Sequence, residues 1–316
     1  MIWHEKVFIT MDTLSVIIVT YNTGRTVLET LESINTQSGD LSTQIIVVDN
    51  QSSNDTGALI KLYYPTVHLI ISDTNRGFGG GNNYGFQSTI GDFIALVNPD
   101  LRVHPKTLAM LVRYLKENSQ VGIVGPRTMD VEGRISVTAH SSYSLANIVL
   151  SYFGFVSLLP TFFNRDDLKI NYTTTDPQIV DWLQGACLVM PRHVFESVRG
   201  FDEAFFLYVE DVDLCHRIRA AGKQVVYHPQ ATATHLQGTS ARNFPYFRVR
   251  GYHLSPLYLF RKRGQHGHVR ILKLVFAVEL LLKSSARRLY NLFKYDQLRA
   301  NQAAAELKVL VESWRY

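Results

Sequence analysis

The sequence predicts an α/β protein, with a mostly parallel central sheet flanked by helices and a helical C-terminal extension. Short runs of β-branched residues alternate with helical stretches through the first hundred residues, and such runs are typical of buried parallel strands. Beyond residue 244 the pattern changes to long helices rich in Lys and Arg. With 316 residues and 46% hydrophobic composition, the chain can bury a large core. We expect one large domain with an appendage.

The first strands and helix follow from the apolar spacing. Strands are expected at 14–20, 44–48, 67–71 and 93–97. A helix is expected at 25–37, because apolar residues recur there with a helical period. Later strands are expected at 121–124, 181–190 and 223–227, and later helices at 105–116, 191–198 and from Glu210 to near Gly222.

Polar residues follow each early strand. They are Thr20, Tyr21 and Asn22 after the first, Asp49 and Asn50 after the second, Asn75 beyond the third, and Asn98 and Asp100 after the fourth. Carboxyl ends of parallel strands meet at one edge, where open α/β folds bind ligands. Any one of these residues could simply cap a helix, but their recurrence at one edge favours a nucleotide crevice.

The segment 75–85, NRGFGGGNNYG, has five glycines in eleven residues. We expect a loop that lets backbone approach a ligand, with Asn82 and Asn83 opening a helix whose N-terminus favours phosphate oxygens. A flexible surface turn is the alternative. The spacing matches neither GxGxxG nor the P-loop, which disfavours a dinucleotide-dependent oxidoreductase.

Two later segments carry candidate chemistry. In 181–190, which begins Asp-Trp182, Gly185 interrupts a strand pattern and suggests that something passes close to the backbone. In FFLYVEDVDLCHR, Glu210, Asp211 and Asp213 open a helix, and the helix dipole alone accounts for acids there. The preceding aromatic residues favour a second interpretation, because poorly hydrated carboxylates make useful bases.

The segment 145–163 is strongly apolar but is broken by Gly154 and Pro160. It is too interrupted to span a bilayer, so we expect core, with an apolar surface for a lipid substrate or membrane as the alternative. The two cysteines, Cys187 and Cys215, have no CxxC spacing, so we expect a reduced protein without a zinc site or disulfide. We interpret residues 1–13 as a short extension and not a signal peptide.

The net charge of +5 is concentrated in the last quarter of the chain. This favours an anionic surface such as lipid headgroups over nucleic acid, although a solvated helical face fits equally well. Within 269–295, apolar residues stand between lysines and arginines, at Ile271, Leu274, Val275, Val278, Leu281, Leu282, Leu289 and Phe293. The pattern fits a membrane interface, a helix packed on the domain, or a dimer interface.

These motifs together resemble the family 2 inverting glycosyltransferases of the GT-A fold, close to bacterial rhamnosyltransferases of cell-surface polysaccharide synthesis. The resemblance rests on VIIVTYN, VVDNQSS, NRGFGGGNNYG, VNPD, WLQGA and FFLYVEDVDLCHR, followed by His235 in a polar loop at 231–240. It covers residues 14–240 and implies a nucleotide-binding half at 14–100 and an acceptor half at 101–240. The helical, basic region 241–316 matches only loosely.

The resemblance implies a role for each motif residue. Those expected in the nucleotide-sugar site are Thr20, Tyr21, Asn22, Asp49, Asn75, Gly77, Asn82, Asn98, Trp182 and Gly185. Asp100 would coordinate Mg²⁺ or Mn²⁺ on the donor diphosphate, with His235 completing the coordination. Asp211 of the Glu210-Asp211 pair would be the catalytic base. Asn98 replaces the first acid of the Asp-x-Asp motif, which should weaken metal binding.

The implied reaction is transfer of L-rhamnose from dTDP-L-rhamnose to a polyprenyl-diphosphate-linked glycan, by a cytoplasmic protein on the inner face of the plasma membrane. The C-terminal helices would contact the membrane or form a homodimer, and no nucleic acid is expected. UDP-galactofuranose, UDP-glucose and UDP-N-acetylglucosamine are alternative donors. A catalytically silent scaffold is a further alternative, which the intact Glu210-Asp211 pair and Asp100 disfavour.

Overall fold

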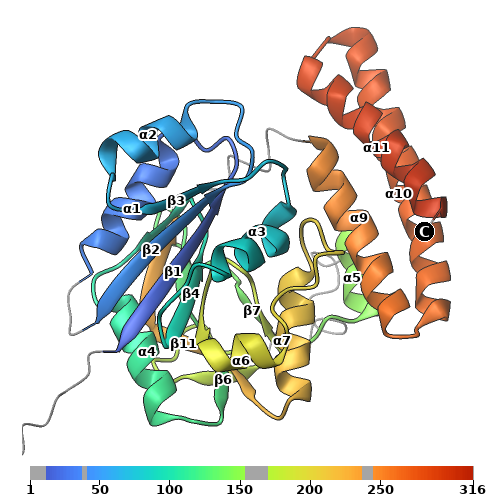
Figure 1. The fold of residues 1–316 in the computed structure, drawn as a ribbon. Coiled ribbons are helices and arrows are strands. Elements are labelled where there is room, and N and C mark those ends of the chain that lie inside the picture. Colours follow the sequence, from blue (N-terminus) through green and yellow to red (C-terminus); the bar gives the residue numbers. More distant parts are fainter. Residues whose placement is uncertain (1–11, 38–40, 154–169, 237–244, 316) are drawn as a thin grey trace, which may run out of the picture.

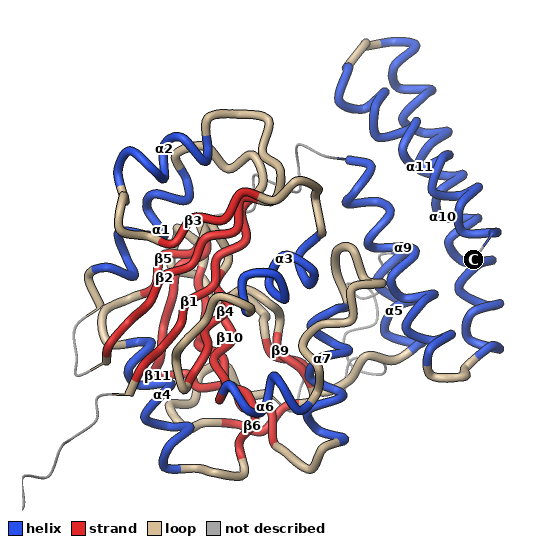
Figure 2. Tube along the Cα trace, in the orientation of Figure 1, coloured by secondary structure: helices blue, strands red, loops and turns tan. Residues whose placement is uncertain are grey.

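The computed structural model describes residues 12–37, 41–153, 170–236 and 245–315 (Figure 1). Helices cover both faces of a central sheet, and three long C-terminal helices lie at its side (Figure 2). This confirms the predicted α/β class and the helical C-terminus. Among the described residues, no helix combines the length and apolar character needed to cross a membrane. The predicted N-terminal extension lies almost wholly outside these residues.

The first half of the sheet is parallel, as predicted. Its strands run in the order β3 (His68–Ile71), β2 (Ser42–Asp49), β1 (Thr13–Thr20) and β4 (Phe93–Val97). The connecting helices are α1 (Thr26–Asn35), α2 (Thr56–Tyr63) and α3 (Gly77–Phe86). Because the strands are parallel, Thr20 and Asp49 end side by side at the same edge.

The second half of the sheet mixes strand directions. Here β10 (Cys187–Pro191) runs antiparallel to both β4 and β6 (Val121–Met129), and β11 (Gln224–His235) runs parallel to β6. Two short strands, β5 (Leu101–Val103) and β8 (Gln178–Val180), run antiparallel to β11. Six of the nine strands described in this sheet therefore share one direction, as expected for a mostly parallel sheet.

Alternate residues of the strands enter two different cores. Val16 and Ile18 of β1 pack toward α1, α2 and α4 (Thr107–Glu117). Ile17 points the other way, into the core formed with α6 (Arg192–Ser197) and α7 (Glu210–Ala220). All three side chains are fully buried, and each contributes about 1.5–3 kcal/mol to stability. The double burial explains why these strands read as continuous apolar runs.

The glycine-rich segment is helical, so the predicted loop is wrong. Helix α3 already begins at Gly77, and Asn82 lies buried within it, where its amide donates to the carbonyl of Phe78 (3.0 Å). The glycines are needed for close packing, because a Cβ on Gly81 or Gly85 would lie 2.7 Å from a methyl group of Val19 or Ile17, respectively. Asn82 therefore does not open the helix.

His235 also differs from its prediction. It ends strand β11, opposite Leu101, and does not lie in a loop. Strand β11 continues through the small polar residues before His235 because β5 pairs with this part of the strand. Tertiary context therefore decides the conformation. Residues 237–240 of the predicted loop lie outside the described residues.

The C-terminal helices form a separate apolar core. They are α9 (Pro245–Lys262), α10 (His266–Phe293) and α11 (Gln297–Arg315), and α5 (Leu145–Phe153) packs with them. This confirms core for the first part of the apolar segment 145–163, while residues 154–163 lie outside the described residues. A domain boundary at residue 240 stays a prediction.

Helix α9 also packs on the loop that precedes α7. Gly251 of α9 allows this approach, because a Cβ there would lie 2.6 Å from the carbonyl oxygen of Leu207. The hydroxyl of Ser255 donates to the same carbonyl (2.9 Å). Lys262 pairs with Asp202 and Asp213 at 2.7 and 2.8 Å. The α7 region is therefore held in place from the C-terminal side.

We predict that Gly77→Ala destabilises the protein far more than Gly133→Ala. Both glycines have positive φ, at 71° and 80°, which alone costs an L-residue about 1–2 kcal/mol. A Cβ on Gly77 would in addition lie 2.0 Å from the carbonyl oxygen of Phe206, whereas nothing lies within 4 Å at Gly133. Urea unfolding measures both variants, and equal losses would contradict the packing argument.

Candidate active site

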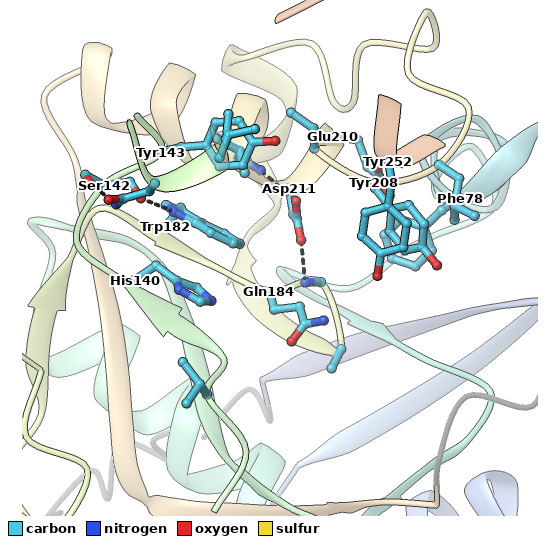
Figure 3. Close-up of a pocket in the computed structure, with 18 of the residues that line it drawn as sticks. Phe78, His140, Ser142, Tyr143, Trp182, Gln184, Tyr208, Glu210, Asp211 and Tyr252 are labelled. Carbon is cyan, nitrogen blue, oxygen red and sulfur yellow. Dashed lines mark hydrogen bonds between the residues drawn. The ribbon is translucent and has the colours of Figure 1, made fainter. Parts of the chain in front are cut away.

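A cavity of about 490 Å³ opens beside the start of α7 (Figure 3). Five residues predicted for the site line it, namely Asn98, Trp182, Gly185, Glu210 and Asp211. Its wall also includes residues that the sequence did not single out for the site, among them His140, Ser142, Tyr143, Tyr152, Gln184, Tyr208 and Tyr252. The size and the few polar groups in an aromatic wall are typical of a pocket for a small ligand.

Asp211 is fixed by two backbone N–H groups. Gly185 donates to its Oδ2 at 2.9 Å and Val212 donates to its Oδ1 at 2.8 Å. Gly185 lies in the interruption between β9 (Trp182–Leu183) and β10, where a Cβ would come within 3.2 Å of the Phe78 ring. The close backbone approach predicted at Gly185 is therefore observed, and its partners are Phe78 and Asp211.

Glu210 is buried beside Asp211 but has a different environment. Its Oε2 atom has no hydrogen-bond partner among the described residues. Burial raises the pKa of Glu210 to about 8, and the charge of Asp211 contributes to the rise. Burial also raises the pKa of Asp211, but the N–H groups of Gly185 and Val212 favour its charged form. These two N–H groups therefore favour the negative charge on Asp211 and the proton on Glu210.

The loop that presents the two acids is strained. Tyr208 and Val209 have φ of 65° and 71°, in the left-handed region that β-branched residues such as valine rarely adopt. Val209 is held by a small apolar cluster that includes Phe205 and Leu259 of α9. Such strain persists only where surrounding packing enforces it, and it concentrates at functional sites.

The cavity wall contains a stacked pair from the small second sheet. β7 (Ala139–His140) pairs with β9, which sets His140 directly opposite Trp182. The two rings are parallel within 10°, with centroids 3.9 Å apart. The indole N–H of Trp182 donates to the carbonyl of Ser142 (3.3 Å). Cross-strand pairing thus presents a rigid, flat aromatic surface.

A second aromatic pair joins the loop before α7 to helix α9. The rings of Tyr208 and Tyr252 stack with centroids 4.1 Å apart, and both line the cavity with Asp211 (Figure 3). Pro256 lies inside α9 and has no N–H for the carbonyl of Tyr252, four residues earlier. The hydroxyl of Tyr152 donates to that carbonyl instead, at 2.6 Å. For the segment of α5 the sequence offered an apolar substrate surface only as an alternative, and it offered no local signal that α9 would contribute to this site.

Several predicted nucleotide-binding residues lie at the strand ends, outside the cavity lining. Thr20 is fully buried and Asp49 nearly so, and Asp49 accepts a hydrogen bond from the N–H of Ser52 (2.8 Å). Asn22 accepts one from the N–H of Ser53 (2.7 Å), while Tyr21 is half-buried at the same edge. The side chains of Asp49 and Asn22 therefore also shape the turn after β2.

Asn50 organises the segment that leads into α3. Its amide donates to the carbonyl of Gly77 (2.9 Å) and to the side chain of Asn75 (3.0 Å), and its oxygen accepts from the N–H of Arg76 (2.9 Å). From the sequence, Asn50 was expected at the edge of the sheet that forms the nucleotide crevice, with a helix cap as its alternative role. The contacts show that it anchors the start of the glycine-rich helix.

Asp100 and His235 form the second polar pair at the sheet edge. The Nε2 atom of His235 lies 3.0 Å from Oδ1 of Asp100, which is buried. Burial lowers the pKa of His235, but the hydrogen bond and charge of Asp100 outweigh it and raise the pKa above its ordinary value. No cluster of three or more metal-binding side chains occurs in the described part of the chain. One carboxylate and one imidazole suit a divalent ion whose other positions are filled by phosphate and water.

Sequence comparisons identify the relatives of this chain. The model for "Glycosyl transferase family 2" matches residues 15–180, just over half of the chain. An N-acetylglucosaminyl-diphospho-decaprenol L-rhamnosyltransferase from Mycobacterium tuberculosis is 27% identical over 88% of this chain and 95% of its own. Rhamnosyltransferase WbbL from Escherichia coli is 28% identical over 78% of this chain and 93% of its own.

Solved structures show a related fold at low identity. GalNAc-T7, solved with UDP, GalNAc and Mn²⁺, superposes with a TM-score of 0.56 at 15% identity, over 78% of this chain but only about half (52%) of that longer chain. The mannosyltransferase PcManGT from Pyrobaculum calidifontis, solved with GDP-Man and Mn²⁺, gives 0.52 at 16% identity over 95% of this chain and 86% of its own. These neighbours have the GT-A fold. The protein belongs to glycosyl transferase family 2 and is a glycosyltransferase of the GT-A fold.

Proposed function

We propose that the protein transfers L-rhamnose from dTDP-L-rhamnose to a hydroxyl group of a lipid-linked glycan at the cytoplasmic face of the membrane. Two relatives that align over more than nine-tenths of their own length are named as rhamnosyltransferases, and one name specifies a diphospho-decaprenol acceptor. The observation that carries the proposal is the unequal pair at the cavity: both carboxylate oxygens of Asp211 accept a backbone N–H, whereas Oε2 of Glu210 has no partner among the described residues. Such a pair provides one ionised carboxylate as a base.

Asp211 is the base in this proposal. Its carboxylate takes the proton of the acceptor hydroxyl as that oxygen attacks the anomeric carbon. The bond from this carbon to the diphosphate oxygen breaks, and the electron pair leaves with the nucleoside diphosphate. Attack from the face opposite the diphosphate inverts the anomeric carbon in one displacement. The Gly185 N–H keeps Asp211 in place and favours its charged state before the reaction.

The aromatic wall is proposed to bind the acceptor sugar. The faces of Trp182 and Tyr252 can cover the apolar face of a sugar ring, while Gln184, Ser142 and Asn147 supply polar groups. The dTDP group is proposed to lie along the strand ends, from Thr20 and Asp49 to Asn98. This arrangement would set the two substrates on either side of the reacting carbon.

Asp100 and His235 are proposed to hold a divalent cation. Bound there, Mg²⁺ or Mn²⁺ would neutralise negative charge that develops on the diphosphate. The donor set fits such an ion, and the Mn²⁺ named with the two solved neighbours supports the choice. Asn98, two residues before Asp100, lines the cavity that also contains the two acids.

We predict that Asp211→Asn lowers the turnover number by about 10²–10⁴-fold, because the amide cannot accept the proton. Glu210→Gln is the matched control and should remain within about tenfold of the parent at pH 7, since Glu210 already holds its proton there. Transfer from dTDP-rhamnose to a soluble acceptor analogue measures both. If Asp211→Asn retained near-normal turnover, the base would have to be another group.

We predict that Glu210→Gln stabilises the protein, and more at pH 8 than at pH 5. The folded state keeps the Glu210 proton up to about pH 8, whereas the unfolded chain loses it near 4.5. The unfolded state therefore binds fewer protons in this window, and the free energy of unfolding falls as pH rises through it. The gain at pH 8 should be on the order of 4 kcal/mol. Equal gains at both pH values in urea unfolding would contradict the buried, protonated state.

We predict that Asp100→Asn and His235→Gln each raise the Mn²⁺ concentration needed for half-maximal transfer by at least about tenfold, because a site with few protein ligands loses one of them. His193→Gln, an exposed change on α6, is the matched control and should leave the requirement unchanged. Electron paramagnetic resonance of free Mn²⁺ in the presence of dTDP gives a binding readout independent of turnover. Unchanged Mn²⁺ binding in both variants would place the cation elsewhere.

A further inference from the structure

Helix α10 has two apolar faces, and only one of them is buried. The inner face carries Val269, Leu272, Phe276 and Leu280, which pack with α5, α9 and α11. The opposite face exposes large apolar side chains, each at least 47% accessible, at Ile271, Leu274, Val278, Leu281, Leu282, Leu289, Leu292 and Phe293. We call these eight residues the outer stripe of α10. They include all but one of the apolar residues that the sequence pattern had indicated in this helix.

The outer stripe is continuous along the helix. At 3.6 residues per turn, its members fall within about one third of the helix circumference. From Ile271 to Phe293 the stripe extends for roughly 33 Å at 1.5 Å per residue. Figure 1 shows α10 beside α11 at the edge of the molecule remote from the sheet. A contiguous apolar surface of this kind marks a contact with another molecule or with a membrane.

The charges of α10 are sorted between the two faces. Lys283 and Arg287 lie toward the inner face, where they pair with Glu279 and Glu306. Arg270 and Arg288 border the outer stripe, are exposed, and form no ion pair with the described residues. Residues 266–316 contain nine Lys and Arg against four Asp and Glu, an excess equal to the +5 of the whole chain. Two of these positive charges, on Arg270 and Arg288, are thus uncompensated and border the exposed apolar surface.

We propose that the outer stripe of α10 lies in the headgroup region of a bilayer containing anionic lipids. The apolar stripe matches the acyl chains of such a bilayer, and the unpaired arginines that border the stripe match the lipid phosphates. A second copy fits less well, because the one acid of α10, Glu279, is buried under the inner face. Two stripes facing each other would therefore bring like charges together.

This surface is directly connected to the active site. Tyr152 lines the cavity and also packs on Phe276 of the inner face, with ring centroids 4.8 Å apart. The cavity and the membrane-facing stripe thus lie on either side of one packed layer of side chains. The inference rests on the proposed function in one respect: membrane binding would hold the cavity near a lipid-linked acceptor.

The test is co-sedimentation of the full chain with vesicles of phosphatidylcholine, alone or mixed with phosphatidylglycerol. Leu282→Gln/Leu289→Gln/Phe293→Gln should weaken binding to the mixed vesicles by at least about tenfold. Arg270→Gln/Arg288→Gln should remove most of the preference for phosphatidylglycerol and its sensitivity to salt. The control, Ile90→Gln/Ile179→Gln, changes apolar residues 73% and 66% exposed on other surfaces and should bind as the parent does.

Two results would overturn the proposal. One is vesicle binding by the triple variant equal to that of the control, with circular dichroism showing both folded. The other is conversion of a dimer to a monomer by the triple variant, in light scattering, without loss of vesicle binding. An assay of transfer to a soluble acceptor separates this proposal from the proposed function. If the protein bound vesicles but did not use dTDP-rhamnose, the membrane-binding surface would be supported and only the proposed function would be rejected.

Discussion

The contact between Gly77 and Phe206 is the constraint on which the site depends. The N–H of Phe78 donates to the carbonyl of Phe206 at 3.0 Å. The same carbonyl lies so close to Gly77 that there is no room for a side chain at position 77. This contact joins α3, which follows the parallel strands β1 to β3, to the strained loop that presents Glu210 and Asp211. Asn50 fixes one side of the contact by anchoring Gly77. The two halves of the site are thus set relative to each other by backbone atoms, which cannot change rotamer.

The C-terminal helices complete this arrangement from the opposite side. Ser255 and Lys262 of α9 hold the loop before α7 and the first turn of α7, and Pro256 frees the carbonyl that receives Tyr152. The strain at Val209 and the burial of Glu210 both cost stability, and this packing offsets them. The region that resembles the family least is therefore part of the wall around the acids.

The sequence predicted what depends on local pattern and missed what depends on packing. The β-branched strands, the acids at the start of α7 and the close approach at Gly185 were all visible in short segments. Helix α3 was not visible in the sequence, because glycine disfavours helices. Glycine is required at positions 81 and 85 only because of their close contacts with β1. The stack of His140 on Trp182 arises from strand pairing across more than forty residues. On α10 the helical period was clear, but the period alone could not tell which apolar face is buried.

The central claim is that Asp211 faces the acceptor hydroxyl across the anomeric carbon from the diphosphate. A crystal structure of the complex with a non-transferable dTDP-rhamnose analogue, Mn²⁺ and a soluble acceptor tests it most directly. We expect the acceptor oxygen within about 3 Å of the Asp211 carboxylate and on the face of the sugar opposite the diphosphate. An acceptor oxygen that contacts another base, or that lies on the same face as the diphosphate, would contradict the account.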